Sequence, residues 1–121
     1  ENLIARHKLL ADAFRAGLKA LNLELFSANP SDSVTAAKVP AGVDGGKIPK
    51  TMRDKYGITI AGGQGSMKGQ IFRLGHLGWY DKSDVAVVFQ SLEFTLKDLG
   101  YTNFQFGASL KATQELLYGK I

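Results

Sequence analysis

Clustered glycines constrain this chain's fold more than any other feature of its sequence. Half of its 14 glycines lie between Gly57 and Gly78, in the segment GITIAGGQGSMKGQIFRLGHLG. Glycine tolerates positive φ and close backbone approach, so residues 62–69 are predicted to form a sharply turning loop. A strand over residues 71–76 follows it. The loop lacks the Gly-Lys-Ser/Thr end of a P-loop, and no GxGxxG enters a helix, so a structural turn or a loop lining another ligand site explains it better than a phosphate cradle.

Hydrophobic periodicity predicts four helices and four short strands along the chain. The predicted helices cover residues 2–21, 47–56, 82–99 and 108–118, and the predicted strands cover 23–27, 34–39, 58–61 and 71–76. A turn signal at residues 29–32 predicts that the first two strands form an antiparallel hairpin. The order α-β-β-α-β-β-α-α predicts an α+β fold with a small, mainly antiparallel sheet and helices packed on one face.

Composition indicates one ordinary globular domain over residues 1–121. Apolar residues make up 45% and charged residues 21% of the chain, and it has no cysteine, which excludes a disulfide scaffold and thiolate metal sites. No apolar run approaches the roughly 20 residues that span a bilayer, and the N-terminus lacks the apolar core of a signal peptide. We therefore expect no membrane partner and a cytoplasmic location, with a peroxisomal or other organellar location left open.

The start of the sequence suggests that the chain is part of something longer. It begins at Glu1, directly inside a helical pattern, and its only methionines are Met52 and Met67. A natural product normally starts with methionine unless it has been cut. We expect an excised segment of a larger protein.

Net charge is modest and scattered, with 15 basic and 11 acidic residues giving +4. The densest basic stretch is interrupted by acids; it comprises Lys47, Lys50, Arg53 and Lys55, with Asp44 and Asp54 among them. Nucleic-acid binding favours a basic stripe with interleaved aromatic residues, so we interpret this stretch as a solvated helix face and expect no nucleic-acid partner. The alternative is a stand-alone basic α+β module that binds an acidic small ligand or RNA.

Arg73 is the most informative single residue, because it lies within the predicted strand between Phe72 and Leu74. An arginine in an apolar strand is costly unless it is paired or faces a site. Its guanidinium group matches a carboxylate bidentately. An internal salt bridge, or an edge strand from which the arginine reaches solvent, is the alternative.

Other candidate residues are weaker. His76 ends the predicted strand, but only His7 accompanies it in the sequence, so a histidine metal site lacks partners and no metal site is expected. Lys38 has apolar neighbours, which suits a Schiff-base lysine, but a strand lysine reaching water is commoner. Trp79 and Tyr80 are interpreted as packing residues. With no Ser–His–Asp set and no close carboxylate pair, the chain is predicted to hold no catalytic residue and no self-sufficient active site.

The glycine loop followed by Ile-Phe-Arg-Leu-Gly-His-Leu-Gly resembles the carboxy-terminal domain of class V aminotransferases. These pyridoxal-phosphate (PLP) enzymes include alanine–glyoxylate and serine–pyruvate aminotransferases. The resemblance is nearest to a branch named the small (tritium-exchange) subunit of soluble hydrogenase, and it covers most of the chain. It implies the small domain of a fold-type I PLP enzyme. No cysteine or histidine cluster in the sequence suits an iron or nickel site, so we interpret the hydrogenase name as a label.

The resemblance also implies roles for particular residues. Arg73 would bind the substrate carboxylate, and Gly62, Gly63, Gly69 and Gly75 would form the active-site loop around it. The PLP lysine and the other cofactor ligands would belong to a large domain of the same parent chain, with no cofactor-binding residue here. The parent would be a homodimeric transaminase acting between a small amino acid and a 2-oxo acid. The 121-residue chain alone would be inactive and would bind no PLP.

Overall fold

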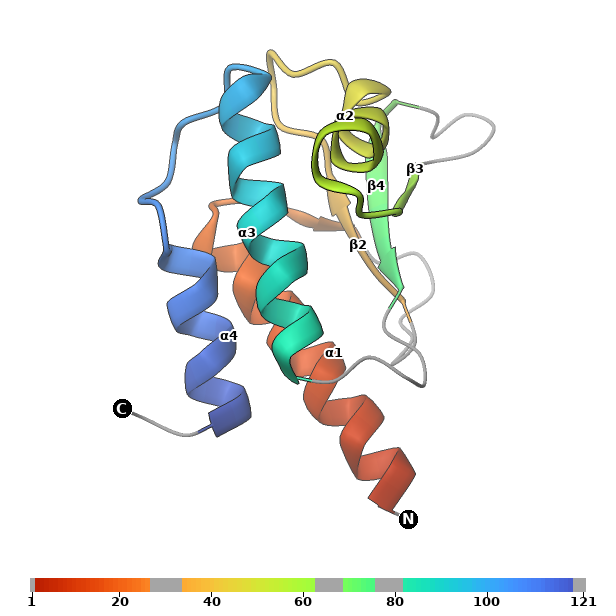
Figure 1. Ribbon diagram of the computed structural model, residues 1–121, viewed down its shortest axis with the longest axis vertical. Coiled ribbons are helices and arrows are strands. Elements are labelled where there is room, and N and C mark those ends of the chain that lie inside the picture. Colours follow the sequence, from red (N-terminus) through yellow and green to blue (C-terminus); the bar gives the residue numbers. More distant parts are fainter. Residues whose placement is uncertain (1, 27–33, 63–68, 76–81, 119–121) are drawn as a thin grey trace.

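The computed structural model describes residues 2–26, 34–62, 69–75 and 82–118, in which four helices and four strands are found (Figure 1). The helices are α1 (Asn2–Ala20), α2 (Lys47–Tyr56), α3 (Lys82–Asp98) and α4 (Ala108–Tyr118). The strands are β1 (Leu25–Phe26), β2 (Val34–Lys38), β3 (Ala61–Gly62) and β4 (Ile71–Gly75). This is the predicted order of elements, and the α+β prediction is confirmed.

The four strands form one sheet in the order β1-β2-β4-β3, and each neighbouring pair is antiparallel. The predicted hairpin of the first two strands is confirmed, because Leu25 pairs with Ala37 and Phe26 with Ala36. β4 pairs with β2 on one side and with β3 on the other. It is therefore an interior strand, even though its nearest sequence neighbour, β3, is an edge.

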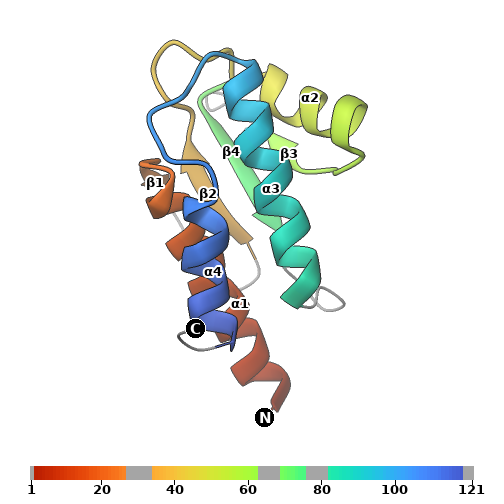
Figure 2. The same cartoon turned by 60° about the vertical axis from the view of Figure 1, so that its left-hand side comes forward.

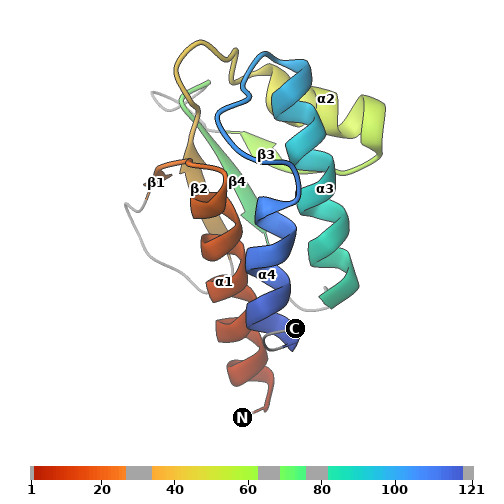
Figure 3. The same cartoon turned by 90° about the vertical axis from the view of Figure 1, so that its left-hand side faces the viewer.

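The helices lie to one side of the sheet, as expected, and the core fills the space between them (Figure 3). The largest fully buried side chains of this core come mainly from α1, α2, β4 and α3, and they include Phe14, Leu18, Met52, Phe72, Phe89 and Leu92. The rings of Phe14 and Phe89 lie 5.4 Å apart, which joins α1 to α3.

Close helix packing depends on one small residue of α1. α4 lies alongside α1 (Figure 2), and a Cβ atom added at Gly17 would lie 2.6 Å from the Phe89 ring and 2.8 Å from Cγ2 of Thr113. No side chain fits there without a shift of the neighbours. Gly17 thus sets the spacing of α1 from α3 and α4.

Helix ends explain why two strands are shorter than predicted. Asn22 takes a left-handed φ of 60°, as expected for a stop, and the N–H of Leu23 donates to the Leu18 carbonyl. Likewise Gly57 has φ 72°, and the N–H of Ile58 donates to the Met52 carbonyl. These hydrogen bonds satisfy carbonyl groups in the last turn of each helix and end the helix. The first residues after each helix therefore complete the helix end, and β1 and β3 start later than the apolar pattern predicts.

Candidate functional site

Arg73 occupies the middle of β4 and points away from the helices. Its neighbours Phe72 and Leu74 are 0% and 1% exposed and belong to the core. Successive side chains of a strand alternate between the two faces of the sheet. Arg73 is consequently on the opposite face, which we call the far face, and it is half-buried there.

Two alanines flank Arg73 across the strands. Arg73 pairs with Ala36 of β2 on one side and with Ala61 of β3 on the other. Directly paired residues share a face, with Cβ atoms about 4.5–5.5 Å apart. The side chain of Arg73 therefore leaves the sheet between two small side chains.

One backbone atom orients the guanidinium group. The Nε of Arg73 donates a hydrogen bond to the carbonyl oxygen of Gly62 at 3.0 Å. None of the ion pairs found between described residues includes Arg73. The edge-strand interpretation of this arginine is wrong, because β4 is interior, and the internal salt bridge is not found in the described part of the chain.

The glycines predicted to surround Arg73 lie in three places. Gly62 ends β3, Gly75 ends β4, and Gly69 lies two residues before β4 with a left-handed φ of 76°. Gly63 is outside the described residues. A Cβ added at Gly45 would lie 2.3 Å from the Gly69 carbonyl oxygen, so the chain before α2 closely approaches the end of the glycine-rich segment.

Lys38 is an exposed surface residue. Its Nζ lies 2.8 Å from Oε2 of Glu24, and its side chain is 48% exposed. Schiff-base lysines lie in desolvated pockets, and this exposed, ion-paired side chain does not. The prediction of a strand lysine that reaches water is confirmed.

Most of the remaining candidates cannot be placed. His76, Trp79 and Tyr80 are outside the described residues, as is the side chain of His7. Among the side chains that the structure describes, no group of three or more His, Cys, Asp or Glu residues could hold a metal ion. No helix in the same residues is long and apolar enough to cross a membrane.

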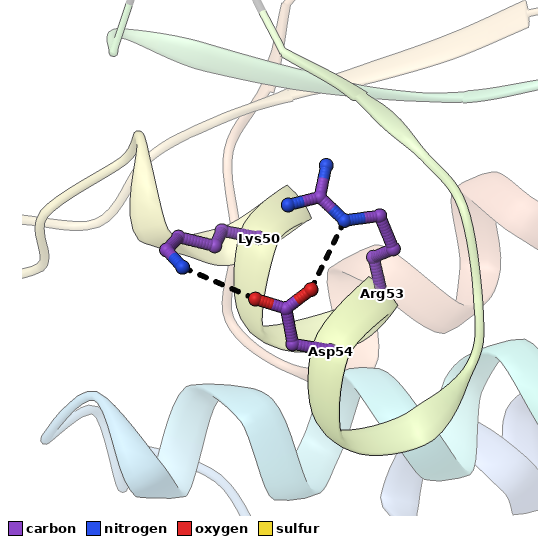
Figure 4. Close-up of polar contacts among 3 residues, drawn as sticks. All are labelled: Lys50, Arg53 and Asp54. Carbon is purple, nitrogen blue, oxygen red and sulfur yellow. Dashed lines mark hydrogen bonds and ion pairs between the residues drawn. The ribbon is translucent and has the colours of Figure 1, made fainter.

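The basic stretch of α2 is paired with acids. Asp54 accepts hydrogen bonds from Lys50 and Arg53, each at 3.1 Å, and these bonds lower the pKa of the Asp54 carboxyl (Figure 4). Lys55 pairs with Asp98 of α3 at 2.8 Å. Several cations here are therefore partly neutralised, which fits a solvated helix face better than a nucleic-acid surface.

Sequence reasoning found Arg73 but missed the atoms that frame it. Ala36, Ala61 and the Gly62 carbonyl are 37, 12 and 11 positions away from Arg73 in the chain, and only the strand order brings them together. Alanine carries no chemical signal by itself. Knowledge of the register would have been needed to find these neighbours.

Comparison with known proteins shows which proteins the chain is similar to. No protein-family model matches the chain. The soluble hydrogenase small subunit of a Synechococcus strain is 43% identical over 97% of the chain, and an uncharacterized aminotransferase of Methanocaldococcus jannaschii is 42% identical over 84%. The serine–glyoxylate aminotransferase of Hyphomicrobium methylovorum is 36% identical over 95%. The chain is homologous to a segment of the class V aminotransferases.

Solved structures agree with this relationship. Ureidoglycine–glyoxylate aminotransferase from Bacillus subtilis has 30% identity and a TM-score of 0.86 over 93% of the chain. Pyridoxamine–pyruvate aminotransferase from Mesorhizobium loti has 28% identity and a TM-score of 0.84 over the same share. The chain corresponds to 30% and 29% of those two structures, and to 31%, 27% and 29% of the three curated relatives. The chain thus spans under a third of the length of the proteins that it matches.

Proposed function

We propose that this chain is the substrate-carboxylate-binding part of a PLP-dependent class V aminotransferase, which transfers an amino group between a small amino acid and a 2-oxo acid. The observation that carries the proposal is Arg73: an interior-strand arginine, on the sheet face away from the core, flanked by alanines and oriented by a backbone carbonyl. A cation held in this way has the geometry to bind a carboxylate. The homology to aminotransferases supplies the reaction.

Arg73 would act by orientation. Its guanidinium group would hold the carboxylate that amino acids and 2-oxo acids share, and so fix the reacting carbon relative to groups elsewhere in the enzyme. A hydrogen bond to a charged group contributes about 1.5–3 kcal/mol. Losing it should therefore lower kcat/KM by about 10- to 100-fold.

PLP would be held by the rest of the longer protein. When bound, PLP supplies the electron sink for amino transfer. Lys38, the lysine weighed for Schiff-base chemistry, is exposed and ion-paired with Glu24, which supports placing the PLP lysine elsewhere. We propose that the large PLP-binding domain belongs to the same parent chain, that this parent is a homodimer, and that it is cytoplasmic.

The test uses the complete enzyme that contains this chain. Arg73→Ala and Arg73→Lys are compared with the wild type in steady-state kinetics, with small amino acids as donors and glyoxylate or pyruvate as acceptors. Arg73→Ala should lower kcat/KM by about 10- to 100-fold for all acid substrates while the PLP absorbance stays unchanged, and lysine should restore only part of the activity. Arg53→Ala, which removes an exposed arginine of α2, is the matched control. An Arg73→Ala enzyme with wild-type kinetics would refute the proposal.

A further inference from the structure

We infer that the Gly62 carbonyl and the alanines at 36 and 61 position Arg73 so that it binds a carboxylate end-on, through its two terminal nitrogens Nη1 and Nη2. This inference rests on the proposed function, since it takes the carboxylate to be that of the substrate. It adds the geometry of the contact and the residues that impose it.

A guanidinium group offers a carboxylate two bidentate edges. The side edge consists of Nε and one Nη, and the end edge consists of both Nη atoms. In this structure the Nε–H of Arg73 is already donated to the Gly62 carbonyl at 3.0 Å. A side-on carboxylate would have to displace that bond and leave a half-buried carbonyl without its donor, which costs free energy. The end edge is available without breaking any contact of a described residue.

The Gly62 carbonyl is itself part of the sheet. Gly62 pairs with Phe72 of β4, and the neighbouring pair is Ala61 with Arg73. The oxygen that orients the guanidinium group is therefore fixed by the same pairing that fixes the Arg73 backbone. A side chain held at both ends loses less freedom when it binds a ligand, and such preorganisation favours binding.

The two alanines provide the space for the ligand. Ala36 and Ala61 are the direct cross-strand partners of Arg73 and share its face of the sheet. A longer side chain at either position would reach the guanidinium group, because directly paired Cβ atoms lie about 5 Å apart. We therefore assign Ala36 and Ala61 as residues that keep the end edge of Arg73 accessible to a carboxylate.

The first experiment measures kinetics of Ala36→Val and Ala61→Val in the complete enzyme. Strands accept β-branched residues, so both variants should fold; Ala36→Ser and Ala61→Ser, with one added oxygen, are the milder versions. Each valine should raise KM for the amino acid and the 2-oxo acid by about tenfold and change kcat by less than about twofold, because access to the carboxylate site is altered and the reacting groups are not. Thr59→Val, an exposed β-branched substitution two residues from Ala61, is the matched control and should change neither constant.

The second experiment observes the guanidinium group directly. The complete enzyme is labelled with ¹⁵N-arginine, the Arg73 signals are assigned with Arg73→Lys, and acetate is added as the carboxylate probe. The Nη signals should shift with acetate while the Nε–H signal keeps its position and its slow exchange. Loss or movement of the Nε–H signal would show side-on binding and overturn the inference.

The outcomes separate this inference from the proposed function. If Arg73→Ala impairs the enzyme but both valine variants keep the wild-type KM, the positioning role of the alanines is wrong and the carboxylate role of Arg73 stands. If Arg73→Ala has no effect, the proposed function fails, and acetate should then leave the Nη signals of Arg73 unchanged.

Discussion

The buried carboxylate of Glu93 in α3 accepts hydrogen bonds from both the backbone N–H and the hydroxyl of Ser109 in the first turn of α4. The N–H of Gly107, the residue before α4, donates to the other carboxylate oxygen at 2.7 Å. Glu93 is 2% and Ser109 0% exposed. The first N–H groups of a helix have no partner within the helix and attract negative charge. Glu93 therefore caps α4 from a neighbouring helix and fixes how the two helices meet.

Glu93→Gln should destabilise the fold. Glutamine has the same shape, but it offers one acceptor oxygen in place of two, and its amide would face N–H donors that then lack a partner. We expect the free energy of unfolding to fall by about 2–3 kcal/mol, the cost of losing hydrogen bonds to a buried charged group. Urea denaturation followed by circular dichroism measures it. Glu115→Gln, an exposed change on α4, is the control, and equal midpoints for the two variants would contradict the capping role.

Gly17→Ala should loosen the packing of α1 against α3 and α4. The added methyl would lie 2.6 Å from ring atoms of Phe89 and 2.8 Å from Thr113, so the helices must move apart. Alanine favours helix by about 1 kcal/mol over glycine, but overpacking costs about 1–3 kcal/mol, so the net change should be destabilising. Thermal unfolding tests this. Gly46→Ala, whose added Cβ would only reach ordinary contact at 3.5 Å, should leave the melting temperature nearly unchanged.

The helices of this fold could be predicted from the sequence because their signals are local. An apolar stripe defines each helix, and left-handed residues end them where the sequence suggests, at Asn22 (φ 60°), Gly57 (φ 72°) and Gly100 (φ 96°). The predicted ends lie within a residue or two of those observed. Strand order carries no such local signal, since it depends on contacts between residues distant in the chain.

The candidate site could be predicted only in part: the arginine could be singled out from the sequence, but its neighbours could not. An arginine between core residues is unusual enough to attract notice in a single sequence. Its partners could not be found in that way, because Ala36, Ala61 and the Gly62 carbonyl gain their meaning only from the register. The Glu93 cap was missed for the same reason: a glutamate on an amphipathic helix is ordinarily exposed, and only the packing of α4 buries this one.

Asp98→Asn should change how stability depends on pH. Lys55 and Tyr56 each donate to Asp98 at 2.8 Å, and these bonds, that of Lys55 foremost, hold the pKa of the Asp98 carboxyl below 3.8. The same contact raises the pKa of Lys55 above 10.5 and that of Tyr56 above 10.0. A lowered acid pKa stabilises the fold above the unfolded pKa, and a raised lysine pKa stabilises it below. The hydrogen bonds to Asp98 should therefore stabilise the fold fully between the unfolded pKa values of Asp98 and Lys55. This stabilisation should be lost as the pH falls through the folded pKa of Asp98 or rises through that of Lys55.

Urea denaturation across pH checks this. The wild type should be slightly more stable than Asp98→Asn near neutral pH, since the pair is largely exposed. The difference should vanish as the pH falls through the folded pKa of Asp98, and again as it rises through that of Lys55. Tyr56→Phe, which removes one of the two donors, should have a smaller effect. A difference that stays constant at acidic pH would show that the ionised Asp98 contributes nothing.

Gly45→Ala should disturb the site from a distance. An added Cβ would lie 2.3 Å from the Gly69 carbonyl oxygen and 2.8 Å from Cγ2 of Val39, and the first of these is backbone, which cannot simply rotate aside. Gly69 is in a left-handed conformation two residues before β4, and the Gln70 carbonyl accepts a hydrogen bond from the N–H of Val39. A displaced Gly69 would therefore strain the start of β4, the strand that carries Arg73.

For Gly45→Ala we expect a loss of about 1–3 kcal/mol in unfolding free energy, as for other overpacked sites. If Arg73 has the proposed role, the complete enzyme should show a KM for amino acid substrates raised more than kcat is lowered, because the proposed carboxylate contact would move while the reacting groups would not. Gly42→Ala is the contrasting variant: its backbone φ of 85° is strained for alanine, but no neighbouring atom lies within 4 Å of the added Cβ. It should cost stability without raising KM, and an equal rise of KM in both variants would show that general loosening, rather than the contact with Gly69, affects the site.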